Sequence, residues 1–312
     1  MQPTLKQLRY FVAAADAGSI TGAARQLNIS QPSVSAAIAE IEQSFALQLF
    51  VRHHAQGLSL TPAGQRLAIE ARSLLAHAEE LRQGALDLAG KPAGEVVVGC
   101  FQTFAPMVVP GLLRAVKQHY PDLGVRLRED HLEGLLDGLR HGRLDLALTY
   151  DLDLDGSLDF TVCAEVPLHV ILAADHRLAA RNRVALADLV EEPLVLLGLP
   201  HSRDYFLSVF RGLGLEPRVA HETPSFEMVR GLVANGYGYS VMHSRPESDQ
   251  ALDGRRLVYR PVREAVRAHR LGIARLAGSR TTRAAALFQQ FCIAHFAAAH
   301  AAGGRRRSKI VS

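Results

Sequence analysis

The sequence of 312 residues has no tryptophan, only three cysteines and no catalytic motif. The cysteines, Cys100, Cys163 and Cys292, are far apart and form no C-x-x-C pair, which argues against a disulfide framework and a zinc site. The motifs G-x-S-x-G, the P-loop and H-E-x-x-H are missing as well. We therefore expect a protein that is not an enzyme and that needs no metal or cofactor.

Long hydrophobic runs are also missing. No stretch of 18 apolar residues and no signal-peptide pattern is present, so we expect a cytoplasmic protein that does not contact a membrane. Apolar residues still make up 48% of the chain and charged residues 21%, which suffices for several hydrophobic cores.

Net charge is small, at +4. The segment 303–312 holds four basic residues and no acidic one, which equals the whole excess, and we expect it to be a disordered basic tail. Residues 1–66 contain five Lys or Arg against three Asp or Glu, so charge supports nucleic-acid binding by this part only weakly.

The stretch from Ser19 to Phe45, SITGAARQLNISQPSVSAAIAEIEQSF, carries the most information. It predicts two short helices with a tight turn at Asn28, a residue that tolerates the left-handed conformation. Ser30 is a good N-cap for the second helix, and Pro32 fits its first turn. Small, uncharged polar residues at the start of that helix suit contact with DNA bases.

Apolar spacing predicts a three-helix core around this pair. The second helix directs one stripe inward, formed by Val34, Ile38, Ile41 and Phe45. An upstream helix contributes Leu5, Leu8, Phe11 and Val12. These patterns alone fit an ordinary helical hairpin as well as a DNA-binding unit.

A family resemblance separates these alternatives. The segments Ala23–Leu27 and Ser30–Ser35 resemble the winged helix-turn-helix of the LysR-type transcriptional regulators. Leu49–Arg52, followed by Leu60–Gly64, is similar to that family's wing and to the start of its linker helix. The resemblance runs from about Leu5 to Gly64, and the family's domain order fits the rest of the chain.

The resemblance implies that the chain binds double-stranded promoter DNA, with RNA polymerase as a further partner there. The residues that we expect at the DNA are Ser30, Gln31, Pro32, Ser33, Ser35, Ala36, Arg52, His53 and His54. Family members often carry Arg or Lys at the position of Ala36, where alanine offers only a methyl contact. Base recognition should therefore depend on Gln31, on the serines and on DNA shape.

A heptad pattern follows in residues 62–90, which we expect to form one long linker helix. Leucine and alanine alternate along one seam, namely Leu67, Ala71, Leu74, Ala78, Leu81, Ala85 and Leu88. We favour a dimer helix over a helix that packs on its own chain, because the alanines let two backbones approach closely. The resemblance agrees, and it implies a homodimer or a homotetramer.

After a Gly- and Pro-rich linker at 90–94, short strands alternate with helices. This alternation predicts parallel sheets covered on both faces, and about 200 residues are too many for one such sheet. The resemblance implies an effector domain like a type 2 periplasmic binding protein. We expect lobe one at 94–163 and 269–302 and lobe two at 164–268, within an effector domain of residues 94–302.

Ligands of such folds bind between the lobes, where strand ends meet helix N-termini. We expect the effector, a small organic anion, to contact Gln102, Thr103, Phe104, His131, Tyr150, His201, Ser202, Arg203, Ser225 and Phe226. Arg203 is the sharpest candidate, because arginine pairs bidentately with a carboxylate. A surface pair of Arg203 with Asp204 or Glu227, and ordinary N-caps for the serines and the threonine, are the competing interpretations.

The sequence thus predicts a mainly α winged helix-turn-helix (1–61), a linker helix (62–90) and a two-lobed α/β periplasmic-binding-like domain. Its predicted function is a DNA-binding regulator controlled by a small molecule. Two rival classes remain at this point. One is a cytoplasmic solute-binding protein without a DNA function, and the other is a helical interaction protein that uses the heptad seam alone.

Overall fold

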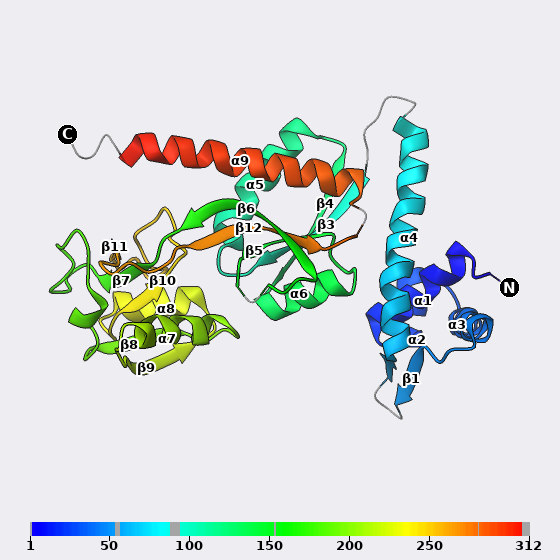
Figure 1. The fold of residues 1–312 in the computed structure, drawn as a ribbon, viewed down its shortest axis with the longest axis horizontal. Coiled ribbons are helices and arrows are strands. Elements are labelled where there is room, and N and C mark those ends of the chain that lie inside the picture. The colour runs from blue at the N-terminus through cyan, green and yellow to red at the C-terminus, as the bar shows by residue number, and fades with distance from the viewer. Residues whose placement is uncertain (1, 54–56, 88–93, 153, 280, 308–312) are drawn as a thin grey trace.

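The computed structural model describes residues 2–53, 57–87, 94–152, 154–279 and 281–307. Figure 1 shows an elongated molecule with a small helical head and a long helix at one end and a larger α/β part beside them. Among the described residues, no helix has the length and apolar character that crossing a membrane would require.

The head consists of three helices and a two-stranded antiparallel wing. Its elements are α1 (Leu5–Ala17), α2 (Ile20–Leu27), α3 (Gln31–Phe45), β1 (Phe50–His53) and β2 (Gly57–Leu60). Asn28 ends α2 with a φ of 54°, the left-handed conformation that the sequence predicted there. The core is built from Phe11, Val34, Ile38 and Ile41, which are almost fully buried.

Phe45 departs from the predicted inward stripe, because it is 44% exposed. The helix ends at once after it, with Ala46 in the left-handed conformation at a φ of 52°. The chain then turns back, and Leu49 and Phe50 fill the core instead, the latter with its ring 5.4 Å from that of Phe11.

The linker helix α4 runs from Pro62 to Asp87. Gly64 is required in its first turn, since a Cβ there would lie 2.1 Å from the Leu49 carbonyl oxygen. Further along the seam Leu74 is 50% and Leu81 is 78% exposed. The last seam residue, Leu88, lies outside the described residues.

Lobe one has one mixed five-stranded sheet. Its strands, in spatial order, are β4 (Leu123–Asp130), β3 (Gly94–Phe101), β5 (Leu146–Tyr150), β12 (His269–Leu276) and β6 (Leu158–Val166). Helix α6 lies on one face, and α5 and α9 lie on the other, as Figure 1 shows. These helices are α5 (Ala105–His119), α6 (Leu132–Arg140) and α9 (Arg283–Arg307).

Lobe two contains a three-stranded antiparallel sheet and a parallel strand pair. The sheet is β10 (Ser240–Met242), β7 (His169–Ala173) and β11 (Leu257–Pro261), and the pair is β8 (Pro193–Leu197) and β9 (Arg218–Thr223). The helical elements are η1 (Leu186–Asp188), α7 (Ser202–Gly212) and α8 (Phe226–Ala234).

The prediction of parallel sheets is correct for the pairs β3–β4, β3–β5 and β8–β9 and wrong for the other strand pairs of the two lobes. Three strands in lobe one are parallel, but β12 runs antiparallel to both of its neighbours, β5 and β6. This follows from the path of the chain. β6 leaves lobe one and β12 returns to it, so the two crossing strands enter the sheet in opposite directions.

Two expected boundaries also differ. β6 continues to Val166 inside lobe one, three residues past the expected end of that lobe's first segment. Helix α9 continues through Gly303 and Gly304 to Arg307, where we expected a disordered tail from residue 303. An alanine-rich run before the glycines and the arginines after them are good helix formers, which outweigh the cost of two glycines. Residues 308–312 lie outside the described residues.

Candidate DNA-binding face and interlobe cavity

The start of α3 is exposed and well capped. The Ser30 hydroxyl accepts a hydrogen bond from the Ser33 backbone N–H at 3.4 Å and lies 2.8 Å from the Ser33 hydroxyl. Gln31, Pro32, Ser33 and Ala36 are exposed, and Ser35 is half-buried. The cap holds this first turn rigid while its side chains remain available to a partner.

Both acidic residues of α3 are engaged within the head. Glu42 accepts hydrogen bonds from the backbone N–H groups of Leu49, at 2.7 Å, and Phe50, at 3.3 Å. Glu40 accepts one from the Gln7 side chain on α1. These carboxylates therefore hold α3 against α1 and the wing, and they do not belong to its exposed first turn.

The wing is fastened on both sides. The Thr61 hydroxyl donates to the Gln48 carbonyl at 2.7 Å, and the Leu58 N–H donates to the Gly18 carbonyl at 2.7 Å. Arg52 on β1 is exposed, as a phosphate contact requires. For His53 only the backbone in β1 is described, and His54 lies outside the described residues, so the structure places neither of these side chains.

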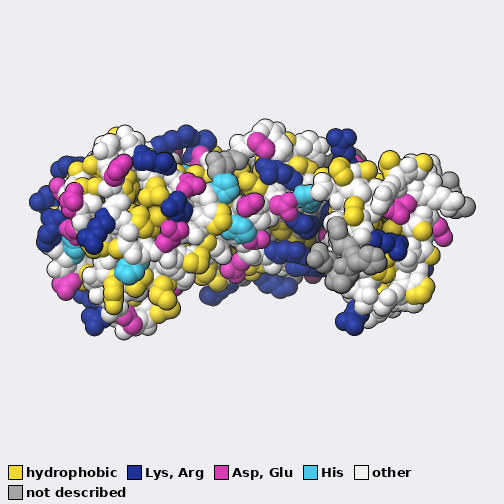
Figure 2. Space-filling view, turned by 90° about the horizontal axis from the view of Figure 1, so that it is seen from below, with side chains coloured by type: hydrophobic (Ala, Val, Ile, Leu, Met, Phe, Trp, Pro, Cys, Tyr) yellow, Lys and Arg dark blue, Asp and Glu magenta, His cyan; other side chains and the backbone are white. Residues whose placement is uncertain are grey.

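The charges on the molecule are mixed. Figure 2 shows Lys and Arg side chains interspersed with Asp and Glu over the effector domain, and few basic side chains on the head at the right. This view agrees with the small basic excess of the head in the sequence.

A small cavity of roughly 20 Å³ lies between the two lobes. Its walls are Phe101, Thr103, Tyr150, Leu152, Leu197, Ser202, Tyr205, Phe206, Met242, His243, Ser244 and His269. Three residues predicted from sequence, Thr103, Tyr150 and Ser202, are among them. A fourth, Phe104, packs behind the wall, with its ring 5.2 Å from that of Tyr150.

The other predicted effector residues are not among the lining residues, and these are Gln102, His131, His201, Arg203, Ser225 and Phe226. Arg203 pairs with Glu222 at 3.2 Å and with Asp204 at 3.1 Å, and its side chain is 46% exposed. Arg203 therefore belongs to an exposed ion-pair group that includes Asp204, as the competing interpretation from sequence proposed. Ser225 caps α8 by accepting from the Met228 N–H at 3.2 Å, again as an ordinary N-cap.

Four polar residues of the cavity were not predicted from the sequence, and these are Tyr205, His243, Ser244 and His269. The Tyr205 hydroxyl lies 2.9 Å from His243 Nε2, and the Tyr150 hydroxyl lies 2.9 Å from the Ser244 hydroxyl. The ring centroids of His243 and His269 are 4.3 Å apart. The position of His243 directly after strand β10 was the one indication in the sequence, since ligands of α/β folds bind at strand ends.

Burial keeps the titratable groups of the cavity neutral. It lowers the pKa of His243 to about 3, with the neighbouring His269 contributing in the same direction. Burial also lowers the pKa of His269, against the opposing influence of Asp151. The pKa values of Tyr150 and Tyr205 are both raised to about 12, chiefly by burial.

Two family models match the chain and together cover nearly all of it. Residues 5–65 match the bacterial regulatory helix-turn-helix protein, lysR family, and residues 89–297 match the LysR substrate binding domain. The chain belongs to the LysR family. The DNA-reading head, the effector-binding domain and the fold class predicted from sequence are thereby confirmed, and the solute-binding alternative is not supported.

Relatives of this LysR regulator cover most of its length. The probable hydrogen peroxide-inducible genes activator of Streptomyces viridosporus is 34% identical over 88% of this chain and 91% of its own. Among solved structures, HinK of Pseudomonas aeruginosa is 40% identical, with a TM-score of 0.64, over 95% of this chain and 99% of its own. A full-length OxyR variant from the same organism is 26% identical, with a TM-score of 0.72, over 94% of this chain and 98% of its own.

The family membership fixes the general activity of this regulator. LysR regulators bind promoter DNA and small-molecule effectors and form oligomers, and the relatives found are transcriptional regulators. In the part of the chain that the structure describes, no group of three His, Cys, Asp or Glu side chains is placed to hold a metal ion.

A second, larger cleft of about 1140 Å³ lies between α4 and lobe one of the LysR regulator. Its walls carry charged residues of both signs, such as Glu70, Glu95, Arg275 and Arg283. Arg72 of α4 spans it. One guanidinium nitrogen contacts Asp16 of the head at 2.5 Å, and another donates to the His141 carbonyl of lobe one. This side chain thus joins three parts of the chain.

Proposed function

We propose that this LysR regulator binds paired half-sites as a dimer, with the first turn of α3 in the major groove of each. The support is the exposed, capped start of α3, from Gln31 to Ala36, together with the linker helix α4, whose seam residues Leu74 and Leu81 are exposed. Two identical heads joined by such helices match the two-fold symmetry of a palindromic operator.

Base recognition in this proposal falls to Gln31, whose amide can pair bidentately with adenine, and to the serines. Arg52 contributes a phosphate contact from the wing. A salt-dependent mobility shift with the DNA upstream of the protein's own gene tests the proposal. Absence of a shift at low salt with every promoter fragment would refute it.

For the effector we propose a small organic anion with a flat or aromatic part, bound in the interlobe cavity. The supporting observation is that aromatic walls, such as Tyr150, Tyr205 and Phe206, surround a few convergent polar groups there. A volume of roughly 20 Å³ is enough for about one water molecule. An organic ligand therefore requires the lobes to move apart and close again around it.

Calorimetric titration of the full-length protein with acetate, succinate, benzoate and salicylate tests the site. We expect at least one of these to bind, and Tyr205→Phe to weaken that binding because the hydroxyl beside His243 is lost. Arg203→Ala is the matched control, since Arg203 is an exposed residue outside the cavity wall on the same helix. Equal losses in both variants would place the site elsewhere.

We further propose where the regulator acts and how it assembles. The regulator acts in the cytoplasm, where its promoter is, and it performs no catalysis of its own. It assembles as a homodimer or, through a second interface, as a homotetramer, and it contacts RNA polymerase at the promoter. Sedimentation of the purified protein with and without operator DNA distinguishes the two assemblies.

Peroxide sensing, which the name of the Streptomyces relative suggests, fits the cysteines poorly. A thiol reacts with peroxide as the thiolate. Burial raises the pKa of Cys163 to about 11 and raises those of the buried Cys100 and Cys292 even more. Little thiolate therefore exists at neutral pH, and a non-redox effector is the better supported choice.

A further inference from the structure

We propose that the interlobe cavity binds its anionic effector together with one proton, which the adjacent imidazoles of His243 and His269 take up. The inference rests on the proposed function, because it assumes that this cavity is the effector site. It assigns the positive charge that the anion needs, and it makes effector binding depend on pH.

The described residues of the cavity wall carry no fixed positive charge. None of the described residues that line the cavity is Lys or Arg. The start of α7 offers few free N–H donors to an anion. The backbone N–H groups of Ser202 and Arg203 already donate to the carbonyls of Pro200 and Leu199. Only the two imidazoles can become cations where an anion would lie.

The hydrogen bonds of His243 fix its neutral form. Its Nδ1 lies 2.8 Å from the Val166 carbonyl oxygen, which can only accept, so Nδ1 carries the proton. Its Nε2 then accepts from the Tyr205 hydroxyl at 2.9 Å. A second proton on Nε2 reverses this bond, and the Tyr205 O–H becomes free to donate to an anion in the cavity.

His269 has an unused acceptor. Its Nδ1 lies 3.6 Å from Asp151 Oδ1, whereas its Nε2 is buried and has no hydrogen-bond partner. A buried polar atom without a partner is costly and calls for an explanation. A proton on Nε2 turns this atom into a charged donor at the cavity wall, and a carboxylate of the effector is the partner that satisfies it.

The charged surroundings limit the uptake to about one proton. Asp151 favours a cation at His269, but Arg270 and Arg267 already neutralise that carboxylate, at 2.6 and 3.6 Å. His169 of β7 disfavours a charge on His243, and each histidine of the pair disfavours a charge on the other. The remaining titratable neighbours, Tyr150 and Tyr205, stay neutral because burial raises their pKa values to about 12.

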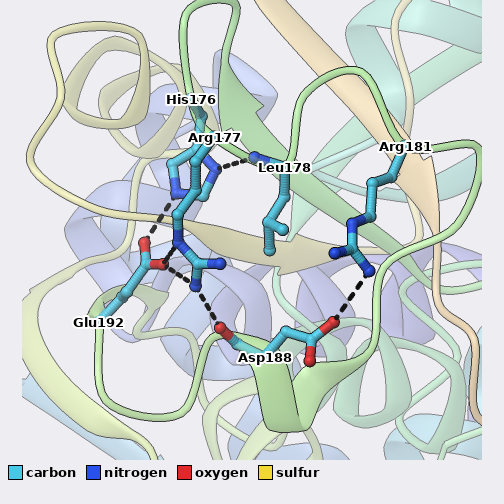
Figure 3. Close-up of polar contacts among 6 residues, drawn as sticks. All are labelled: His176, Arg177, Leu178, Arg181, Asp188 and Glu192. Atoms are coloured by element: carbon cyan, nitrogen blue, oxygen red, sulfur yellow. Dashed lines mark hydrogen bonds and ion pairs between the residues drawn. The ribbon is translucent and has the colours of Figure 1, made fainter.

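Another histidine in lobe two shows what a satisfied imidazole looks like. His176 Nε2 lies 2.7 Å from Glu192, and its Nδ1 accepts from the Leu178 N–H at 3.1 Å (Figure 3). Arg177 also binds Glu192, so the network is complete without a ligand (Figure 3). By contrast, the Nε2 atom of His269, at the start of β12, has no such partner.

The pair also lies where the lobes are joined. His269 is the first residue of β12, the strand that returns to lobe one, and His243 is bonded to Val166, the last residue of the outgoing strand β6. Protonation of the pair thus changes the hydrogen bonding of His243 Nε2 with Tyr205 and of His269 Nε2, both close to the crossing strands. The proton and the effector together would favour one arrangement of the lobes.

Calorimetry of the full-length protein tests the inference directly. Titrations with acetate, succinate, benzoate and salicylate at pH 6, in two buffers of different ionisation enthalpy, give the number of protons taken up. We expect about one proton per bound anion, and an affinity that falls about tenfold per pH unit over the range in which the pair titrates. Uptake near zero for every anion that binds would overturn the inference and leave the proposed site intact.

Variants identify the groups that take up the proton. The double variant His243→Gln/His269→Gln should bind the anion more weakly, without proton uptake and without the pH dependence. The control is His221→Gln on the exposed strand β9, which should behave like wild type. Undiminished uptake in the double variant would refute the assignment to this pair.

A second measurement covers the case in which the double variant does not fold. Histidine ring NMR of the wild-type protein at pH 6 should show an imidazolium appearing in step with saturation by the bound anion, and spectra of the single variants assign it. No change in any histidine on binding would contradict the inference. If none of the four carboxylates binds at all, it is the proposed function that fails.

Discussion

The DNA-reading head and the interlobe cavity solve the problem of recognition in opposite ways. In the head, the residues proposed to read bases lie within about two helical turns, from Ser30 to Ala36, and most are exposed. In the cavity, the polar groups come from positions as far apart as Thr103 and His269, and most are buried. A site built from one helix end follows from local spacing, whereas a site built by tertiary packing does not.

The two sites also differ in how they use charge. The head presents uncharged polar side chains and has engaged its acids, Glu40 and Glu42, in internal contacts. The cavity holds titratable side chains that burial keeps neutral. The head should therefore respond mainly to DNA sequence, and the cavity mainly to pH and to ligand.

The largest expected effect comes from loss of the dimer, which should abolish tight DNA binding by the head and leave the cavity unaffected. Leu74→Lys with Leu81→Lys places charges on the exposed seam of α4, and we expect dimer dissociation and a loss of operator affinity of at least about 100-fold, because a single head binds only one half-site. Anion binding in the cavity should not change. Sedimentation, mobility shift and calorimetry provide the three readouts, with Glu70→Lys on the same helix as the control. A double variant that is still dimeric and binds DNA as tightly as wild type would refute the assignment of this seam as the dimer interface.

Acidification should destabilise the effector domain and spare the head. The pKa of His243 is about 3 in the folded protein, against 6.5 for an ordinary histidine. Below about pH 6.5 the unfolded chain therefore binds more protons than the folded chain, and the free energy of unfolding decreases as the pH is lowered. Between pH 7 and pH 5 this histidine alone should cost about 2 kcal/mol. Urea denaturation at both pH values measures it, and His243→Gln should show a smaller decrease than wild type.

Gln31→Ala should weaken the head alone. Loss of one bidentate base contact costs about 1–3 kcal/mol, so operator affinity should fall roughly tenfold or more while binding to unrelated DNA stays the same. Gln43→Ala, at the exposed far end of the same helix, is the matched control. Equal losses on operator and unrelated DNA would show that Gln31 contributes no sequence reading.

The smallest expected effect concerns the end of the recognition helix. Ala46 adopts a φ of 52°, a conformation that glycine takes without strain. Ala46→Gly should therefore stabilise the head by about 0.5 kcal/mol, after allowance for the greater freedom of glycine in the unfolded chain. Thermal unfolding should show a small rise in midpoint, with DNA affinity unchanged. A fall in the midpoint would mean that the alanine methyl group makes a contact worth more than the strain.

The sequence predicted the head well because its determinants are local. Caps at Ser30 and Asn28 and the apolar periods specify the helices directly, and the family motif added the wing. The error at Phe45 arose at the point where a turn, and not the helical period, decides what is buried.

The cavity was predicted only in part, and for a physical reason. Thr103, Tyr150 and Ser202 follow strands or begin helices, so the rule for α/β folds finds them. His269 begins a strand that the sequence pattern did not reveal, and Tyr205 lies one turn inside a helix. Their convergence depends on how the two lobes pack. The same packing leaves Arg203 outside the cavity wall, although sequence analysis ranked it first.

The two strands that connect the lobes pair with each other from end to end, apart from a bulge at Cys163, between the pairs of Leu271 and Gly272. The ladder of β6 and β12 extends from Leu158 opposite Leu276 to Val166 opposite His269, so the connection is a two-stranded ribbon up to the last residue before lobe two. The twist between paired strands varies widely, and it varies most in two-stranded ribbons. Lobe two should therefore move chiefly by rotating about the ribbon axis. A ligand that holds lobe two in place would then set its angle relative to lobe one.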